Sequence, residues 1–534
     1  MNDAIRTTSN DINPQSIAIV GSGMCGMTTA LALASRGHRV TVFERDARPP
    51  DGDADDAFFR WQRLGAAQFR HPHAFLGLMC NLIQDNYPEL MERLYEAGAR
   101  RVDFFDMLPA ELRDDYVPAP GDEKLWVLLC RRATLETVIR RYVETMPNVE
   151  IHNRCHVVGL VTEDSAGVQA ATGLRVRQRG DGAEDSKSAG PEKIFDADVV
   201  VDASGRSSRF PTWLKAQRRD VIEGGEGTEV REVREVREEK SCAEIVYYTR
   251  HYRLKPGEEE PPRGENRGAG DFGFLKYGVF PGDNGHFAII LCVPVKETRL
   301  REALKDSALF DRICQSIPGL QPWLADGRSE PTTDSFGIGD IQAVWRHFVA
   351  DGEPLALNFF AVGDAAIRTN PLYGRGCSTG ILHAHILADV LEQESDPRAR
   401  ALAFDERTEA DLRPIYDASL REDQSGIRRA EALMQGLLLD KPDSFKKWFG
   451  LAFGDALAAA ARERIHVMRG LLRTFHLLEK PGDFLKDRRI RLTVLAFMLR
   501  GRKRNAARRL QKGPNRDEML SLVSQAGAQS STDS

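Results

Sequence analysis

The 534-residue sequence predicts an α/β fold in three parts: a parallel-sheet domain, an antiparallel-sheet domain and a helical C-terminal region. Three observations predict it. The segment SIAIVGSGMCGMTTALALASRGHRVTVFERD (16–46) has the pattern of strand, glycine-rich turn, helix and second strand. Strand-length apolar segments at 243–254, 272–282 and 286–295 follow one another as in an antiparallel sheet. From about residue 440 the chain is helical in composition and periodicity.

The first segment indicates a Rossmann-like, dinucleotide-binding unit. Gly21, Gly23 and Gly26 form G-x-G-x-x-G directly after an apolar strand, and the second strand ends at Glu44. Gly21 permits a tight turn, Gly23 leaves room for a pyrophosphate, and Gly26 lets helix and strand pack closely. The helix N-terminus attracts phosphate charge, and Glu44 can accept hydrogen bonds from ribose hydroxyls. The segment therefore predicts a dinucleotide site.

Three further segments resemble one flavoprotein family, that of the aromatic hydroxylases, squalene and polyether epoxidases, geranylgeranyl reductases and flavin halogenases. RRATLETVIRR (131–141) is similar to the R-x-x-L-E segment of that family, and DADVVVDASGRSSRF (196–210) to its mid-chain strand and turn. GDAAIRTNPLYGRGC (363–377) is similar to its G-D-A…N-P-x-Y-G-Q-G signature. The likeness spans residues 16–395 in order. It implies a glutathione-reductase-type FAD fold, with FAD as the cofactor.

The resemblance also implies cofactor contacts. Arg132 would reach the flavin nucleotide, and Asp364 would bond the ribityl chain or the pyrophosphate. The backbone after Pro371 would line the isoalloxazine ring, and the helix from Cys377 would direct its N–H groups at the pyrimidine edge of that ring. The expected cofactor-binding residues are Gly21, Gly23, Gly26, Glu44, Arg45, Arg70, Arg132, Val158, Gly205, Gly363, Asp364, Pro371, Gly374, Gly376 and Cys377.

Four residues are catalytic candidates. QFRHPH (68–73) resembles a Q-x-R-H-x-H segment of the branch with lipophilic substrates, which implies that His71 and His73 lie on a loop near the flavin. KYGVFPG (276–282) resembles a Y-x-x-F-P strand that lines the pocket, and contributes Tyr277. Arg375 stands where many relatives have Gln; it could stabilise anionic reduced flavin or point to solvent.

Composition argues against several other classes of protein. Eight cysteines occur without C-x-x-C, and His71-x-His73 lacks a third ligand nearby, so neither a disulfide framework nor a metal site is expected. The formal net charge of -5 gives no sign of nucleic-acid binding. The N-terminus has no apolar signal region, and no apolar run approaches membrane-spanning length, so a cytoplasmic location is expected.

The stretch 484–512 carries eleven Lys/Arg and one Asp, interleaved with apolar residues. It predicts either a basic amphipathic surface for peripheral contact with an anionic membrane, or a helix packed on the body with a solvated basic face. The expected domains are an FAD-binding domain at 14–240 and 355–395, a substrate-binding sheet domain at 241–354 and a C-terminal helical region at 396–534.

The expected function is that of an FAD-dependent oxidoreductase, first of all a monooxygenase that hydroxylates or epoxidises a small apolar organic substrate. The resemblance implies that O2 is a co-substrate and that a flavin hydroperoxide carries the oxygen. A reductase or dehydrogenase of an isoprenoid-like alkene, a halogenase-like enzyme and a flavin-binding protein without catalysis stay open as alternatives. The sequence shows no second G-x-G-x-x-G domain, so the electron source is either NAD(P)H directly or a separate flavin reductase.

Overall fold

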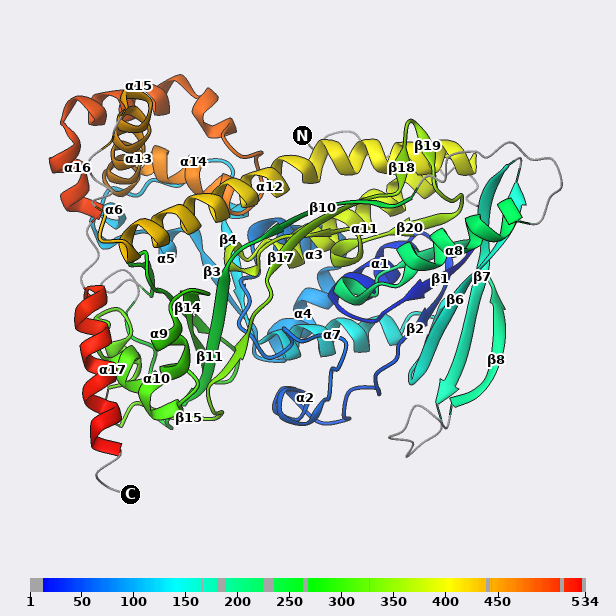
Figure 1. Cartoon of the computed structure of the whole chain (residues 1–534), viewed down its shortest axis with the longest axis horizontal. Coiled ribbons are helices and arrows are strands. Elements are labelled where there is room, and N and C mark those ends of the chain that lie inside the picture. Colours follow the sequence, from blue (N-terminus) through cyan, green and yellow to red (C-terminus); the bar gives the residue numbers. More distant parts are fainter. Residues whose placement is uncertain are drawn as a thin grey trace.

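A five-stranded parallel sheet forms the centre of the computed structural model (Figure 1). The structure describes residues 13–165, 167–179, 189–223, 235–262, 268–325, 327–437, 442, 444–509 and 513–530. The strand order is β20–β9–β1–β2–β5, and every neighbouring pair is parallel. These strands are β1 (Ser16–Val20), β2 (Arg39–Phe43), β5 (Val149–His152), β9 (Val199–Asp202) and β20 (Phe359–Ala361). Their carboxyl ends share one edge, the edge at which open α/β sheets bind ligands.

Both faces of the parallel sheet are covered, which is why its strands are apolar without alternation. One face packs against α1 (Met24–Ala34), α7 (Arg132–Glu144) and α11 (Gly376–Gln393) in one hydrophobic core. The other face packs against an antiparallel sheet of β6 (Cys155–Ser165), β7 (Val168–Arg179) and β8 (Ala189–Asp196).

The antiparallel sheet predicted between 243 and 295 is confirmed. Its order is β12–β13–β14–β11–β15, with β16 also paired to β11. The strands are β11 (Ile245–Leu254), β12 (Ala269–Asp271), β13 (Lys276–Pro281), β14 (His286–Pro294), β15 (Ser329–Pro331) and β16 (Phe336–Ile338). Alternate side chains point to opposite faces, so one face holds its own core and the other faces the nucleotide-binding domain.

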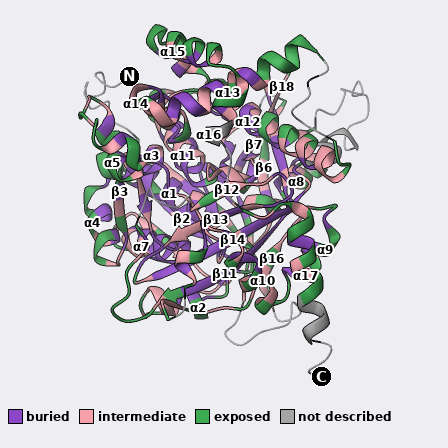
Figure 2. Cartoon of the chain, turned by 90° about the vertical axis from the view of Figure 1, so that its left-hand side faces the viewer, coloured by how far each residue is buried: buried purple, intermediate pink, exposed green. Residues whose placement is uncertain are grey.

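The C-terminal helices occupy three places. The long α12 (Pro397–Met434) runs along the molecule (Figure 1). A lobe at one end contains α13 (Phe445–Glu463), α14 (Ile465–Phe475), α15 (Arg488–Leu499) and α16 (Arg502–Arg509). Beyond it, α17 (Arg516–Ser530) packs on α9 (Thr298–Ala303) and α10 (Ser307–Gln315), and so joins the core of the antiparallel sheet. Figure 2 shows α15 and α17 on the outside of the molecule.

Shorter elements complete the fold. They are α2 (Ala54–Arg60), α3 (Gly77–Asn86), α4 (Pro88–Glu96), α5 (Phe104–Met107), α6 (Ala110–Arg113), α8 (Phe210–Glu223), the pair β3 (Arg100–Asp103) and β4 (Trp126–Leu129), the sheet of β10 (Arg237–Cys242), β17 (Gln342–His347) and β21 (Ile367–Arg368), and the pair β18 (Val349–Ala350) and β19 (Glu353–Pro354). Among the described residues, no helix is long and apolar enough to cross a bilayer.

Candidate functional site

The glycine-rich turn after β1 has a different physical reason for each glycine. Gly21 has a φ of +102°, and a Cβ there would lie 2.6 Å from the carbonyl oxygen of Ala203. A Cβ at Gly26 would lie 1.9 Å from the carbonyl oxygen of Gly21. At Gly23 the only atom within 4 Å of an added Cβ is a nitrogen of Arg63, at 3.8 Å. Two glycines are therefore demanded by the fold, and the third leaves open space at the N-terminus of α1.

Glu44, at the end of β2, is a buried acceptor beside this turn. Its carboxylate accepts hydrogen bonds from the backbone N–H of Ser22 at 2.8 Å, the Ser22 hydroxyl at 2.6 Å and the N–H of Asp46 at 2.9 Å. Burial by itself would raise the pKa of Glu44, but Arg63 and these hydrogen bonds outweigh it and hold the pKa below its ordinary value. The side chain is therefore an anion at neutral pH.

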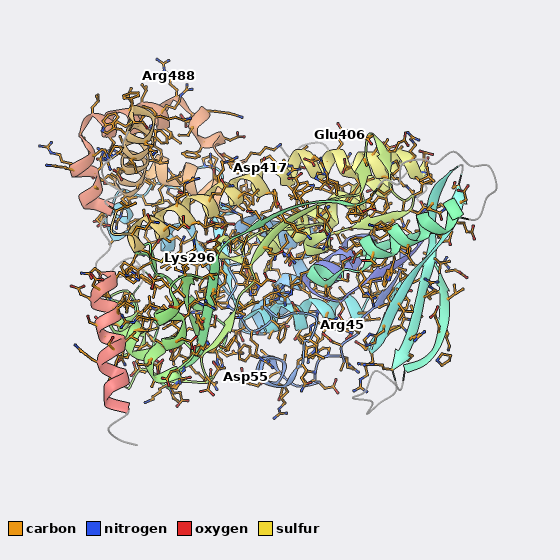
Figure 3. The ribbon with its side chains drawn as sticks, in the orientation of Figure 1. Arg45, Asp55, Lys296, Glu406, Asp417 and Arg488 are labelled. Atoms are coloured by element: carbon orange, nitrogen blue, oxygen red, sulfur yellow. The ribbon has the colours of Figure 1, made fainter. Side chains whose placement is uncertain are left out.

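Arg63 is a site residue that the sequence motifs did not indicate. Its side chain is 3% exposed and lies 3.2 Å from Glu44, 3.9 Å from Asp46 and 3.6 Å from Glu136. Its Nε has no hydrogen-bond partner among the described residues. A buried cation at the open end of α1 suits a pyrophosphate. The expected Arg45 instead lies partly exposed, 4.0 Å from Asp46 (Figure 3).

Val158 occupies an irregular point in the β6–β7 ladder. The register passes from Val157 to Gly159, so Val158 has no paired residue opposite it. A bulge of this kind leaves backbone N–H and C=O groups free for another partner. Val158 is one of the residues expected to bind the cofactor.

At the other end of the site, Asp364 meets residues from distant segments. It follows Gly363, whose φ is +58° and whose added Cβ would lie 2.5 Å from the sulfur of Cys25. Burial raises the pKa of Asp364, and the guanidinium groups of Arg368, Arg132 and Arg206 offset that rise in part. The carboxyl group of Asp364 is therefore half-buried and lies among three cationic side chains.

Arg132, at the start of α7, links this anion to the histidine segment. Its guanidinium donates to the Glu136 carboxylate at 2.5 Å and to Nε2 of His73 at 2.8 Å. Nδ1 of His73 lies 2.8 Å from the carbonyl oxygen of His71, to which it donates. The charge of Arg132 also interacts with Cys377 in the first turn of α11. Three motifs separated in the sequence thus converge at one place.

The turn 370–376 is tied to both neighbouring parts of the fold. The Asn370 side chain accepts from the Tyr247 hydroxyl of β11 and donates to Asp423 of α12 at 2.6 Å. The hydroxyl of Tyr373 donates to the same carboxylate at 2.8 Å. These bonds fix the backbone that begins at Pro371.

The two glycines of this turn differ in surroundings. Gly374 has a φ of +65°, and its added Cβ would lie 2.9 Å from Cβ of Ala74, the residue directly after the histidine segment 68–73. A Cβ added at Gly376, the first residue of α11, would meet no atom within 4 Å. The N-terminus of α11 is therefore open, and the turn packs on the chain next to the histidine segment. Gly205, after β9, is likewise open and has a φ of +72°.

Three other expected residues have structural partners. Arg375 donates to the Ser419 hydroxyl at 2.7 Å and to Glu422 at 3.0 Å, so its charge is paired on α12. Arg70 lies at the histidine segment but donates to the Phe58 carbonyl at 2.9 Å. Tyr277 packs with Phe272 in the core on the outer face of the sheet, at a ring distance of 5.5 Å. The alternation of β13 puts it on the face opposite Phe280.

Two hollows lie on the inner face of the antiparallel sheet. The first, of about 320 Å³, is lined by Arg70, His71, His73, Arg131, Arg132, His251, Phe280 and Pro281, among others. The second, of about 520 Å³, is lined by Ile245, Lys276, Cys292, Lys296, Asn370, Leu372, Tyr373 and Asp423, among others. The second hollow therefore opens directly onto the turn 370–376.

His251 of β11 is a second residue that the motifs did not indicate. It shares the first hollow with His71, whose Nδ1 lies 2.8 Å from the Thr249 hydroxyl. Burial lowers the pKa of His71 to about 4 and that of His251 to about 3. These imidazoles are therefore neutral at physiological pH and can accept or donate one hydrogen bond. Among the described residues, no group of three His, Cys, Asp or Glu could hold a metal ion.

Sequence comparisons agree with the nucleotide-binding geometry. Residues 16–104 match the family model of the FAD dependent oxidoreductases. Protein Rv3254 of Mycobacterium tuberculosis is 29% identical over 216 residues, 38% of this chain and 40% of the relative. An FAD-dependent monooxygenase of Aspergillus terreus is 34% identical over 93 residues, 17% of this chain and 18% of the relative. The chain thus spans less than half the length of these curated relatives.

Solved structures share the fold over most of the chain. The flavin-dependent brominase Bmp2 aligns with a TM-score of 0.55 and 15% identity, over 92% of this chain and 100% of that chain. The p-nitrophenol 4-monooxygenase PnpA of Pseudomonas putida aligns with a TM-score of 0.51 and 17% identity, over 88% and 99%. PqsL of Pseudomonas aeruginosa, solved in complex with 2-aminobenzoylacetate, aligns with a TM-score of 0.51 and 16% identity, over 79% and 100%. The chain has the fold of FAD-dependent monooxygenases and halogenases.

Proposed function

We propose that this protein is an FAD-dependent monooxygenase that inserts one oxygen atom of O2 into an apolar organic substrate. One observation carries the proposal: the turn 370–376 joins a nucleotide-binding sheet edge to a largely apolar hollow beneath an antiparallel sheet. An enzyme of this kind needs both, a cofactor held at one end and a dry substrate pocket at the other.

The residues present fit FAD. The open space at Gly23 and the buried Arg63, whose Nε has no partner among the described residues, suit a pyrophosphate. Glu44 is an anionic acceptor for ribose hydroxyls, and the bulge at Val158 offers backbone groups to a base. Asp364 and Arg132 would hold the ribityl part. FAD bound here would supply the redox chemistry that activates O2.

The chain supplies orientation and a dry environment. Helix α11 begins at Gly376, and the backbone N–H groups of its first turn lie at an open end of the helix. The helix dipole favours negative charge there. The neutral imidazoles of His71 and His251 add no charge to the first hollow. In the second hollow, Ile245, Cys292 and Leu372 form an apolar wall that would exclude water from a bound substrate.

Polar groups at the edge of the second hollow would fix the orientation of the substrate. Lys276 is ion-paired to Asp271 at 3.3 Å, and Asp423 is held by Asn370 and Tyr373. Burial raises the pKa of Asp423, so its carboxyl can hold a proton more readily than an exposed one. A substrate with an apolar body and one hydrogen-bonding group suits this lining.

The test is the fate of labelled O2. Purified protein with FAD, an electron source and candidate isoprenoid, polyketide or aromatic substrates is supplied with isotopically labelled O2, and the product mass is measured. One labelled oxygen atom in the product is expected. Product formed equally well without O2, with two hydrogens gained or lost, would replace the proposal by a reductase or dehydrogenase. A halogen atom in the product when halide is present would replace it by a halogenase.

The same assay identifies the electron source. Substrate-dependent oxidation of NADH or NADPH by the purified protein alone indicates direct reduction. Activity that appears only after a flavin reductase is added indicates a separate reductase. Both results are compatible with a monooxygenase, because neither changes where the oxygen atom of the product originates.

A further inference from the structure

Helix α15 has two apolar faces, and only one of them is used by the fold. Ile490, Val494 and Phe497 are buried in a core shared with α13. Leu492, Leu495 and Leu499 are 55%, 53% and 84% exposed. Their spacing of three and four residues puts these leucines on one helix face, opposite the buried one. A helix that merely packs on the protein body needs no second apolar stripe.

Unpaired cations border this leucine face, defined here as Leu492, Leu495 and Leu499. At about 100° per residue, Arg488 and Arg491 lie on the same side of α15 as the leucines. Both are exposed, and neither has an ion-pair partner among the described residues. Arg488 points outward from the lobe (Figure 3). The sequence contains no acidic residue between 488 and 509. Arg500 and Arg502 pair with Glu463 and Asp455 of α13, so among the described residues Arg488 and Arg491 are the cations beside the leucine face that lack an ion-pair partner.

The same lobe exposes aromatic side chains at the start of α13. Phe445, Trp448 and Phe449 are 77%, 43% and 47% exposed. Phe445 stacks on Trp448 at a ring distance of 5.8 Å, and Lys446 and Lys447 stand between them in the sequence. Exposed Trp and Phe beside Lys are typical of residues at a membrane–water interface.

We propose that the lobe α13–α16 docks on an anionic lipid bilayer, with the leucine face of α15 inserted among the acyl chains. The leucines would be buried in the interface, and Arg488 and Arg491 would meet lipid phosphates. A second copy of this chain is a poorer occupant, because a symmetric contact through α15 would bring unpaired arginines together. No described helix can span the bilayer, so the contact is peripheral.

The proposal does not depend on the proposed enzymatic activity, although the two are compatible in space. Lys296, which lines the 520 Å³ hollow, lies at the same end of the long axis of the molecule as Arg488 (Figures 1 and 3). Docking through the lobe would therefore hold this end of the protein, with its larger hollow, near the lipid.

Vesicle co-sedimentation tests the proposal on the full-length protein. The wild-type protein is expected to bind vesicles of phosphatidylcholine and phosphatidylglycerol in equal parts at low salt. It should bind pure phosphatidylcholine vesicles at least about tenfold more weakly, because these carry no net charge and each Lys or Arg near an anionic surface strengthens binding. High salt should weaken binding to the mixed vesicles, because it screens the arginine–phosphate attraction.

Two variants separate the parts of the surface. Leu492→Ser with Leu495→Ser and Leu499→Ser should lower vesicle affinity at least about tenfold through lost apolar burial. Arg488→Glu with Arg491→Glu should lower it similarly and flatten the salt dependence. The matched control replaces two exposed apolar residues outside the lobe by Ser: Leu64, 80% exposed in the turn after α2, and Ile194, 64% exposed on β8. This variant should bind vesicles like the wild type. Circular dichroism and thermal melting verify that each variant is folded.

Three results would overturn the proposal. The first is wild-type protein that ignores the mixed vesicles at low salt. The second is a folded triple-serine variant that binds them as tightly as the wild type. The third is a wild-type protein that is dimeric in solution and becomes monomeric in the triple-serine variant, with vesicle binding unchanged. That result would assign the leucine face to contact with a second copy of the chain.

Discussion

Replacing Asp364 by Asn tests whether this carboxylate serves the cofactor or the fold. Burial disfavours its charged form, and Arg368, Arg132 and Arg206 compensate only in part. No hydrogen bond within the described chain depends on this carboxylate in the way that Ser204 and Ser208 depend on Asp202. Asn keeps the shape and removes the charge. The apoprotein should therefore tolerate the change, with its Tm altered by less than about 2 °C.

The FAD complex should not tolerate it. A charged hydrogen bond contributes about 1.5–3 kcal/mol, so the dissociation constant for FAD should rise about tenfold to a hundredfold. Because ligand binding stabilises only the folded state, the same loss should appear as a lower Tm of the FAD-saturated protein at fixed FAD concentration. Fluorescence titration of apoprotein with FAD measures the first quantity, and melting with and without FAD measures the second.

Asp283→Asn provides the matched control. Asp283 is fully buried and accepts from the backbone N–H of Arg131 and from its guanidinium. Removing one partner of such a pair costs about 3–5 kcal/mol, so this variant should melt earlier with and without FAD. The role given to Asp364 is refuted if its Asn variant binds FAD like the wild type, or if its apoprotein is destabilised as much as its FAD complex.

Further predictions follow from three local environments. Gly23→Val fills open space, so the apoprotein should keep its Tm but no longer retain FAD. In Gly26→Ala the new Cβ meets backbone atoms, which should cost about 3 kcal/mol of folding stability with or without FAD. Thermal melting of the two apoproteins distinguishes these outcomes. Arg375→Gln should leave the flavin midpoint potential within about 30 mV of the wild type, because Glu422 already pairs the charge; a larger shift in a spectroelectrochemical titration would show that the charge of Arg375 reaches the ring. Burial lowers the pKa of His383 in the folded protein from 6.5 to about 3. As pH falls below about 6.5, this histidine is protonated in the unfolded chain but not in the folded protein, so folding stability is lost. By about pH 5 the loss is about 2 kcal/mol, and His383→Gln should remove that part of the pH dependence in urea unfolding; an unchanged slope would contradict it.

The fold could be predicted because its signals are local. The sequence around Gly21, Gly23 and Gly26 sets strand, turn and helix within about thirty residues, and the structure reproduces each step. In the antiparallel sheet, β13 and β14 are adjacent in the chain and pair with each other, whereas β11 pairs with β14 and not with the strand that follows it in the sequence. Short-range periodicity is sufficient to predict the strands themselves, because it depends only on residues within each segment.

The site could be predicted only where a motif carries it. Thr249 of β11, 178 residues after His71, lies within hydrogen-bond distance of its ring, and His251 of the same strand lines the same hollow as His71. Nothing in the local pattern of β11 marks one inward-facing residue as a pocket residue. Tyr277 shows the same limit: a resemblance identifies the strand, but the parity of its side chains decides which residue faces the pocket, and a shift of one residue exchanges the faces.

Arg63 shows why buried charges are informative where motifs are silent. Three carboxylates, those of Glu44, Asp46 and Glu136, surround this single guanidinium, whose Nε and the facing Oε2 of Glu136 lack hydrogen bonds among the described residues. Such a cluster is costly to bury unless its remaining polar atoms find partners. A pyrophosphate and ribose offer both acceptors and donors, so a cofactor would complete these contacts as well as occupy the space at Gly23. Under the proposed function, the free energy of FAD binding would be coupled to the stability of this cluster, and we infer that Arg63 contributes to the nucleotide site although no sequence motif contains it.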